Sequence, residues 1–206
     1  MLVGTWGRKI GMTQCFLKDR VVPLTAIDVS HWYVVNMRYK ERDGYDAVQV
    51  GLLKERYQQE PWSASFLKNL KKYFLFVREI RLEKIDPSIT VGMLLSPETI
   101  VSVGDVVHVT GITKGAGFAG VIRRHGFNGP RASHGSTMGK RPGSSGCIRR
   151  GGKVFTGKRF PGHMGAVQRV MRNLEIIQVE PTARVIFVKG SIPGKGRSLV
   201  YIKKSE

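Results

Sequence analysis

The sequence predicts a mainly β protein: a small closed β-barrel with one helix and a long, irregular, basic loop inserted into it. Three observations support this fold class. Short segments rich in β-branched residues occupy the first half of the chain and return after residue 173. Only one stretch, at about 61–76, spaces its apolar residues as a helix does. Between these parts, residues 106–174 contain thirteen Lys and Arg, fifteen Gly and no Asp or Glu.

Three strands are expected in the first half of the chain. They are the β-branched segment 21–29, the alternating segment 47–53 and the short segment 106–110. Turn sequences, Asp-Gly at 43–44 and Gly-Asp at 104–105, precede the second and the third of these segments. The first half is therefore predicted to begin a sheet.

One helix is expected at about 61–76. Its apolar side chains recur every three or four residues, at Trp62, Phe66, Leu70, Tyr73 and Phe74. Lysines occupy the opposite face, and Pro61 suits a first helical turn. We expect this aromatic stripe to pack into the core rather than to stack on nucleic-acid bases.

Three further strands are expected after the basic loop, at 174–179, 184–190 and 198–202. They are too few to form a stable sheet by themselves, so we expect them to complete the sheet of the first half and close a barrel. The predicted barrel domain is then 1–113 plus 173–206, and residues 114–172 form a loop whose two ends lie close together at the barrel.

The loop is not of low complexity, because phenylalanines, a methionine and histidines are interspersed among its basic residues. Its glycines and prolines interrupt every periodic pattern, so no regular element longer than a few residues is expected. Structureless segments of this length are commonly functional or disordered. We expect the loop to become ordered on a partner, with its aromatic side chains available for stacking.

The charge of the chain identifies the class of partner. Its 34 Lys and Arg against 15 Asp and Glu give a net charge of +19 and a pI near 10.4, which is typical of nucleic-acid-binding proteins. A membrane surface is not favoured, because the chain has no apolar run of about 18 residues and no lipidation motif. The N-terminus lacks the features of a secretory peptide, and Cys15 and Cys147 lie far apart, as in a reducing compartment. A cytoplasmic protein is expected.

Motifs that suggest enzymes lack their necessary partners. Residues 115–120 read G-x-G-x-x-G, but a dinucleotide site also needs an acid about twenty residues later, and the next acid is Glu175. The glycine spacing of residues 134–140 does not match a Walker loop. The histidines of the loop have no nearby carboxylate in the sequence to fix a tautomer, so contact with a base or a phosphate is the better interpretation. No catalytic residue, metal site, cofactor or small-molecule substrate is predicted.

The predicted RNA-binding residues lie in the loop. Many of its basic residues come in pairs every eight to ten residues, as suits an extended chain that meets successive phosphates. No helix-turn-helix, zinc-finger or bZIP pattern is present, which favours recognition of folded RNA by shape and backbone. The candidates are Lys114, Gly115, Gly117, Phe118, Arg123, Arg124, His125, Arg131, His134, Lys140, Arg141, Arg149, Arg150, Lys153, Lys158, Arg159 and His163.

These segments resemble a known family. Residues 113–127, TKGAGFAGVIRRHGF, are similar to the signature of the ribosomal protein L3 family (uL3) of the large subunit. The similarity continues, in family order, at 7–16, 133–136, 141–144, 152–155, 162–165 and 188–194. The resemblance implies a six-stranded barrel of the translation-protein type and a basic extension that runs through large-subunit rRNA toward the peptidyl transferase centre. It also implies early binding during assembly, ribosomal proteins L14 and L19 as neighbours, and no enzymatic activity.

Two positions depart from the family pattern. Ala116 stands where relatives usually carry Lys or Arg, and Arg149 stands where some bacterial relatives carry a glutamine that is methylated. Two alternatives remain open: an RNA-modifying enzyme with a basic substrate channel, and a protein that compacts duplex DNA. A bacterial cytoplasm fits the sequence, and so does an organelle after removal of a transit peptide.

Overall fold

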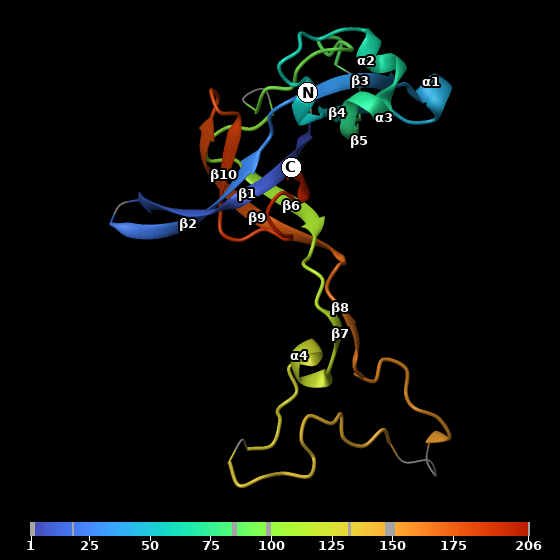
Figure 1. Cartoon of the computed structure of the whole chain (residues 1–206), viewed down its shortest axis with the longest axis vertical. Coiled ribbons are helices and arrows are strands. Elements are labelled where there is room, and N and C mark those ends of the chain that lie inside the picture. Colours follow the sequence, from blue (N-terminus) through green and yellow to red (C-terminus); the bar gives the residue numbers. More distant parts are fainter. Residues whose placement is uncertain are drawn as a thin grey trace. The chain divides into compact units, whose positions relative to one another are not determined.

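The structure is a computed structural model that describes residues 3–17, 19–83, 86–97, 100–131, 133–146 and 151–205. The chain divides into two compact units. The first comprises residues 1–112 and 168–206, and the second comprises residues 113–167. Figure 1 shows the elements of both units along the chain.

The first unit contains an antiparallel barrel of six strands. Their order is β1-β11-β6-β9-β10-β2, and β2 pairs with β1 again, so the ring of strands closes. The prediction of a mainly β fold is confirmed. The barrel strands are β1 (Gly4–Leu17), β2 (Arg20–Asp28), β6 (Val106–Ile112), β9 (Gln168–Glu180), β10 (Val185–Lys189) and β11 (Leu199–Lys204).

Alternate side chains of these strands fill the barrel. Ile27, Ile186 and Val188 are fully buried, as are Val109, Ile176 and Ile202 from the remaining side of the ring. Because successive side chains of a strand point to opposite faces, each strand contributes every second residue to this interior. The removal of this apolar surface from water drives closure of the sheet.

A second sheet of three strands lies in the same unit. Its order is β3-β4-β5, with β3 at Trp32–Arg38, β4 at Ala47–Leu53 and β5 at Phe74–Arg81. The expected strand 47–53 therefore belongs to this sheet and not to the barrel, which is a correction. Six of its seven residues are buried. Strand β4 is the central strand of this second sheet. The sequence patterns did not distinguish this sheet from the barrel.

The prediction of one helix at 61–76 is wrong in extent. The structure has two single-turn helices, α2 (Ser65–Lys68) and α3 (Leu70–Tyr73), and strand β5 begins at Phe74. Asn69 lies between the two helices with φ −135° and ψ 72°, outside the helical region. The aromatic run from Tyr73 onward favours a strand, and pairing with β4 extends it to Arg81.

The expected aromatic stripe packs inside the protein, as predicted. Phe66 and Phe74 are 3% exposed, and Trp62, Tyr73 and Tyr57 pack around them. The Trp62 and Phe66 rings meet edge to face at 5.7 Å. Two further short helices complete this unit, α1 at Lys40–Asp43 and a 3-10 turn at Glu55–Tyr57.

The boundary of the inserted unit differs from the predicted loop, 114–172. Strand β9 begins at Gln168, which pairs with Ile112 of β6. The ladder between β6 and β9 therefore takes residues 168–172 into the first unit. No helix among the described residues is long and apolar enough to cross a membrane.

Candidate nucleic-acid interface

The two ends of the inserted unit, residues 113–167, are joined by backbone hydrogen bonds. The amide of Thr113 donates to the carbonyl of Val167 at 3.0 Å, and the amide of Ala116 donates to that of Met164 at 2.8 Å. Strand β7 (Gly117–Ala119) then pairs with β8 (Gly162–Met164). A short antiparallel ladder thus closes the base of the unit.

Gly165 permits this closure. Its φ is +77°, and a Cβ atom there would collide with the carbonyl oxygen of Lys114. Only glycine combines such a backbone conformation with so close an approach of the opposite chain. The glycine is therefore needed where the two arms of the loop first meet.

The G-x-G-x-x-G segment has a structure unlike that of a dinucleotide site. Gly117 begins strand β7, whose partner β8 is antiparallel, and Gly120 precedes helix α4 (Val121–His125). That helix has five residues and ends at Gly126, which takes the left-handed conformation with φ 70°. A dinucleotide fold needs parallel strands and a long helix behind the glycines.

Helix α4 fixes two of the predicted RNA-binding residues inside the unit. Arg124 donates from Nη1 to the carbonyl of Phe160 at 2.7 Å, and Nε2 of His125 lies 3.0 Å from the same oxygen. A Cβ atom on Gly162 would be 2.7 Å from Arg124 Nη1, so glycine there leaves room for the guanidinium. Arg124 and His125 thus link the two arms of the loop.

Most of the other predicted residues point into solvent. Lys114, Arg123, Arg131, Lys140, Arg141, Lys153, Lys158 and Arg159 are exposed, and so are His134 and His163. The absence of Asp and Glu from residues 106–174 means that none of these cations has an acidic partner within the unit. Gly115 and Gly117 are exposed too. Arg149 and Arg150 lie outside the described residues, as does Cys147.

The structure places two predicted aromatic residues opposite each other. Phe118 of β7 pairs with His163 of β8 in the antiparallel register, so both side chains lie on one face of the ladder. Phe118 is 78% exposed, which is unusual for so large an apolar side chain. Phe155, farther along the loop, is 69% exposed. Exposed rings among cations are suited to stacking on unpaired bases.

Beyond its base, the hydrogen bonds among the described residues of the unit are local. In the described residues from 127 to 159, they join Met138 to Arg141, Gly151 to Lys153, and Phe155 to Lys158 along the backbone. Two serine hydroxyls accept from amides two residues later. Apart from Gly151, which is helical, the described residues of this stretch belong to no helix or strand. The path of this segment therefore depends little on long-range contacts.

Two basic residues were missing from the candidates. Arg169 and Arg172 are exposed on the first part of strand β9, where every residue from Gln168 to Asn173 is exposed. Both lie inside the acid-free run of residues 106–174, and that location could have identified them. They were missed because neither belongs to the pairs of adjacent basic residues that guided the choice of RNA-binding candidates. No group of three or more potential metal ligands is found in the described part of the chain.

Comparison with known proteins places these features in a family. The model of the family Ribosomal protein L3 matches residues 95–184, which include the entire inserted unit. The chain is 40% identical to the large ribosomal subunit protein uL3 of Syntrophus aciditrophicus over 97% of this chain and 92% of the relative. It is also 40% identical to the uL3 of Carboxydothermus hydrogenoformans, over 98% and 97% of the two chains. The uL3 of Syntrophotalea carbinolica is 38% identical over 100% of this chain and 99% of its own.

Proposed function

The chain belongs to the ribosomal protein L3 family, and we propose that its basic unit, residues 113–167, binds large-subunit rRNA. As a member of this family it is a structural protein of the large ribosomal subunit in the cytoplasm, and it is not an enzyme. This membership therefore excludes the first open alternative, an RNA-modifying enzyme.

One observation carries the proposal of rRNA binding. The basic side chains of the unit are exposed, and the acid-free sequence provides no internal counter-charge. Phosphates of a folded RNA would neutralise these cations and release the counterions that an isolated RNA holds. The exposed Phe118 and His163 add a surface on which bases can stack.

The predicted residues have four proposed roles. Lys114, Arg123, Arg131, Lys140, Arg141, Lys153, Lys158 and Arg159 meet phosphates, with Arg149 and Arg150 assigned to the same group from sequence alone. Phe118, His134 and His163 meet bases or sugars, while Gly115 and Gly117 allow close backbone approach. Arg124 and His125 act mainly by holding the loop together, because both side chains already interact with the carbonyl oxygen of Phe160.

The place of the chain in the subunit follows from the family resemblance. The barrel is of the translation-protein type and anchors the protein, while the loop extends toward the peptidyl transferase centre. The protein binds rRNA early and helps to nucleate subunit assembly, with L14 and L19 as its neighbours. Ala116 removes one phosphate contact that relatives make, and Arg149 replaces the methylated glutamine of some of them.

Binding to matched nucleic acids tests the proposal. The purified full-length chain is titrated with large-subunit rRNA and with duplex DNA at the same salt concentration. We expect tighter binding to rRNA, because an extended chain with exposed rings suits splayed bases and irregular backbone. Equal affinity for the two would contradict the proposal and favour the second open alternative, a protein that compacts DNA.

A further inference from the structure

Strands β1 and β2 continue beyond the ring of the barrel. β1 pairs with β11 only from Gly4 to Arg8, and β2 pairs with β10 only from Leu24 to Asp28. Farther out, residues 14–17 of β1 pair with residues 20–23 of β2, and no third strand joins these residues in the described chain. Figure 1 shows this β1–β2 ribbon extending from the barrel.

One face of the ribbon carries exposed apolar side chains together with the polar Gln14, and it becomes buried at Thr25, the partner of Met12. The register places Phe16 opposite Val21 and Gln14 opposite Pro23, and Met12 lies on the same face two residues before Gln14. Phe16 is 72% exposed, Val21 56% and Met12 54%. All three side chains are therefore more than half exposed.

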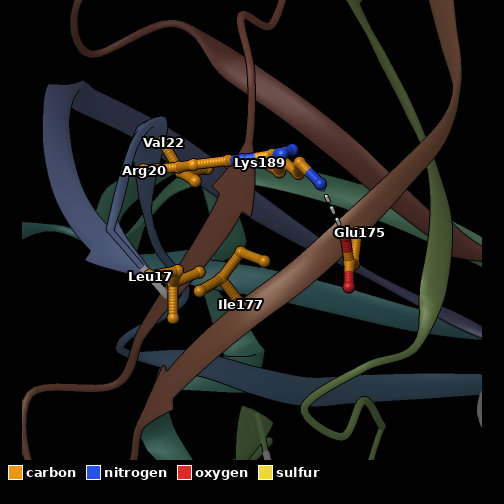
Figure 2. A pocket seen from close by; sticks show the side chains of 6 residues that line it. All are labelled: Leu17, Arg20, Val22, Glu175, Ile177 and Lys189. Carbon is orange, nitrogen blue, oxygen red and sulfur yellow. Dashed lines mark hydrogen bonds and ion pairs between the residues drawn. The ribbon is translucent and has the colours of Figure 1, made fainter.

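The opposite face of the ribbon has a different environment. Leu17 and Val22 of that face line a hollow of about 520 Å³ together with Ile177 of β9. Figure 2 shows Arg20, Lys189 and Glu175 around the same hollow, where Lys189 and Glu175 form an ion pair at 3.0 Å. This second face therefore has apolar and charged neighbours from the barrel. On the first face, Thr25 donates a hydrogen bond to the carbonyl of Gly190, whereas Phe16 and Val21 farther out remain exposed.

The absence of charge indicates what covers the exposed face. Although the chain carries a net charge of +19, residues 10–17 and 21–27 contain no charged side chain. Surfaces that bind nucleic acid combine aromatic rings with a positively charged groove. The centres of protein interfaces are instead rich in aromatic residues and Met and poor in charge. The face of Met12, Phe16 and Val21 matches the second description.

The outer edge of β1 offers a second feature. Over residues 11–17 this edge has no strand partner in the described part of the chain. Exposed edges are usually protected by charged residues, proline or a bulge that turns them away. The ladder between β1 and β2 has a bulge at Lys9–Gly11. The stretch beyond it, from Gly11 to Leu17, has neither a charge nor a proline, so its backbone groups remain available for an added strand.

We propose that the exposed face of the β1–β2 ribbon is a protein-docking surface. Its occupant is an extended, apolar segment of a neighbouring large-subunit protein, which pairs with the outer edge of β1 and covers Met12, Phe16 and Val21. This inference rests on the proposed function only in requiring that the chain is assembled in the subunit. It adds a protein contact on the barrel to the RNA contacts of the loop.

Photo-crosslinking in the assembled subunit tests this inference. The crosslinker p-benzoylphenylalanine replaces Phe16 in one full-length variant and Phe118 in another, and subunits containing each are purified and irradiated. We expect the Phe16 position to crosslink to one large-subunit protein and the Phe118 position to rRNA. A Phe16 crosslink to rRNA or to a second copy of this chain, or none, would overturn the docking surface. Failure at Phe118 alone would count only against the proposed RNA contact.

A charge placed on the same face provides the specificity control. Met12→Lys, introduced beside the crosslinker at position 16, should lower the yield of the protein crosslink several-fold. Val103→Lys changes another exposed apolar residue, 64% exposed and outside the ribbon, and should leave the yield unchanged. Equal yields in both variants would show that the apolar face does not form the contact.

Discussion

Arg123 and Arg124 are adjacent in the sequence, but their side chains have different surroundings. Arg123 is exposed, whereas Arg124 is half-buried and donates a hydrogen bond to the carbonyl of Phe160. Sequence alone treats the pair as equivalent cations. The structure makes Arg123 the cleaner probe of phosphate binding, because removal of Arg124 would also release the opposite arm of the loop.

Arg123→Ala should weaken binding to large-subunit rRNA and reduce its dependence on salt. Each lost phosphate contact changes the slope of log K against log salt by roughly 0.7–0.9. The slope is measured from titrations of the full-length chain at several salt concentrations. A slope equal to that of the unaltered chain would show that Arg123 does not meet a phosphate.

Arg42→Ala is the matched control for this measurement. Arg42 is also exposed, at 63%, but it forms an ion pair with Asp43 at 3.0 Å. Since this charge is already compensated within the protein, its removal should leave the salt slope unchanged. A comparable decrease in both variants would assign the effect to net charge rather than to a contact in the loop.

His31 is a residue whose protonation opposes folding. Burial lowers the pKa of His31 below its usual 6.5, and Arg184 and Arg8 lower it further against the opposing effect of Asp28. Its Nδ1 atom is buried without a hydrogen-bond partner among the described residues. The neutral ring is therefore favoured in the folded state. Its contribution to stability is present above pH 6.5 and is lost as the pH falls toward the lower, folded-state pKa.

His31→Asn should remove part of the loss of stability between pH 7.5 and pH 5.5. Asparagine tolerates the left-handed backbone of this position, where φ is 58°, so the substitution keeps the turn. The free energy of unfolding is measured by urea titration of both proteins at the two pH values. An identical decrease in both would mean that His31 does not titrate differently on folding.

At the scale of elements, strands were easier to predict than the helix. Segments such as 47–53 and 106–110 are rich in β-branched residues, and the structure places strands there. Strand β1 escaped prediction because Gly4–Leu17 contains three glycines and several polar residues. Its structure depends on pairing with β2 and β11, which a local pattern does not contain.

The helix at 61–76 shows how tertiary pairing overrides local periodicity. Its aromatic spacing does reflect burial, since Phe66 and Phe74 both enter one apolar cluster. The chain reaches that cluster through two single turns and a strand instead of a continuous helix. Within the loop, the sequence identified the basic side chains, but the role of Arg124 depends on Phe160, 36 residues away.

Limited trypsin digestion should distinguish the loop from the barrel. In the free chain we expect early cleavage after Arg131, Lys140, Lys153 and Lys158, because only local hydrogen bonds hold the described residues from 127 to 159. The barrel strands should resist longer. Assembled subunits should protect the same sites. Equal resistance of the loop and the barrel without RNA would contradict ordering of the loop on its partner.

At the scale of the whole molecule, charge is divided by region. Residues 106–174 carry only positive charges, whereas the earlier part mixes both signs and pairs many of them, as in the Arg8–Asp28 and Arg38–Asp43 ion pairs. In the earlier part, the ion pairs that form on folding can neutralise charges of both signs. We propose that an external polyanion neutralises the basic part, and membership of the ribosomal protein L3 family identifies the large subunit as its setting.

Co-sedimentation in a high-salt gradient tests the central claim most directly. The tagged full-length chain is expressed together with a variant in which Lys140, Arg141, Lys153, Lys158 and Arg159 are replaced by Ala, and the ribosomal subunits are separated in high salt. We expect the unaltered chain to travel with the large subunit and the variant to be depleted from it. An unaltered chain at the top of the gradient, or a variant retained as fully as the unaltered chain, would contradict rRNA binding through the basic loop.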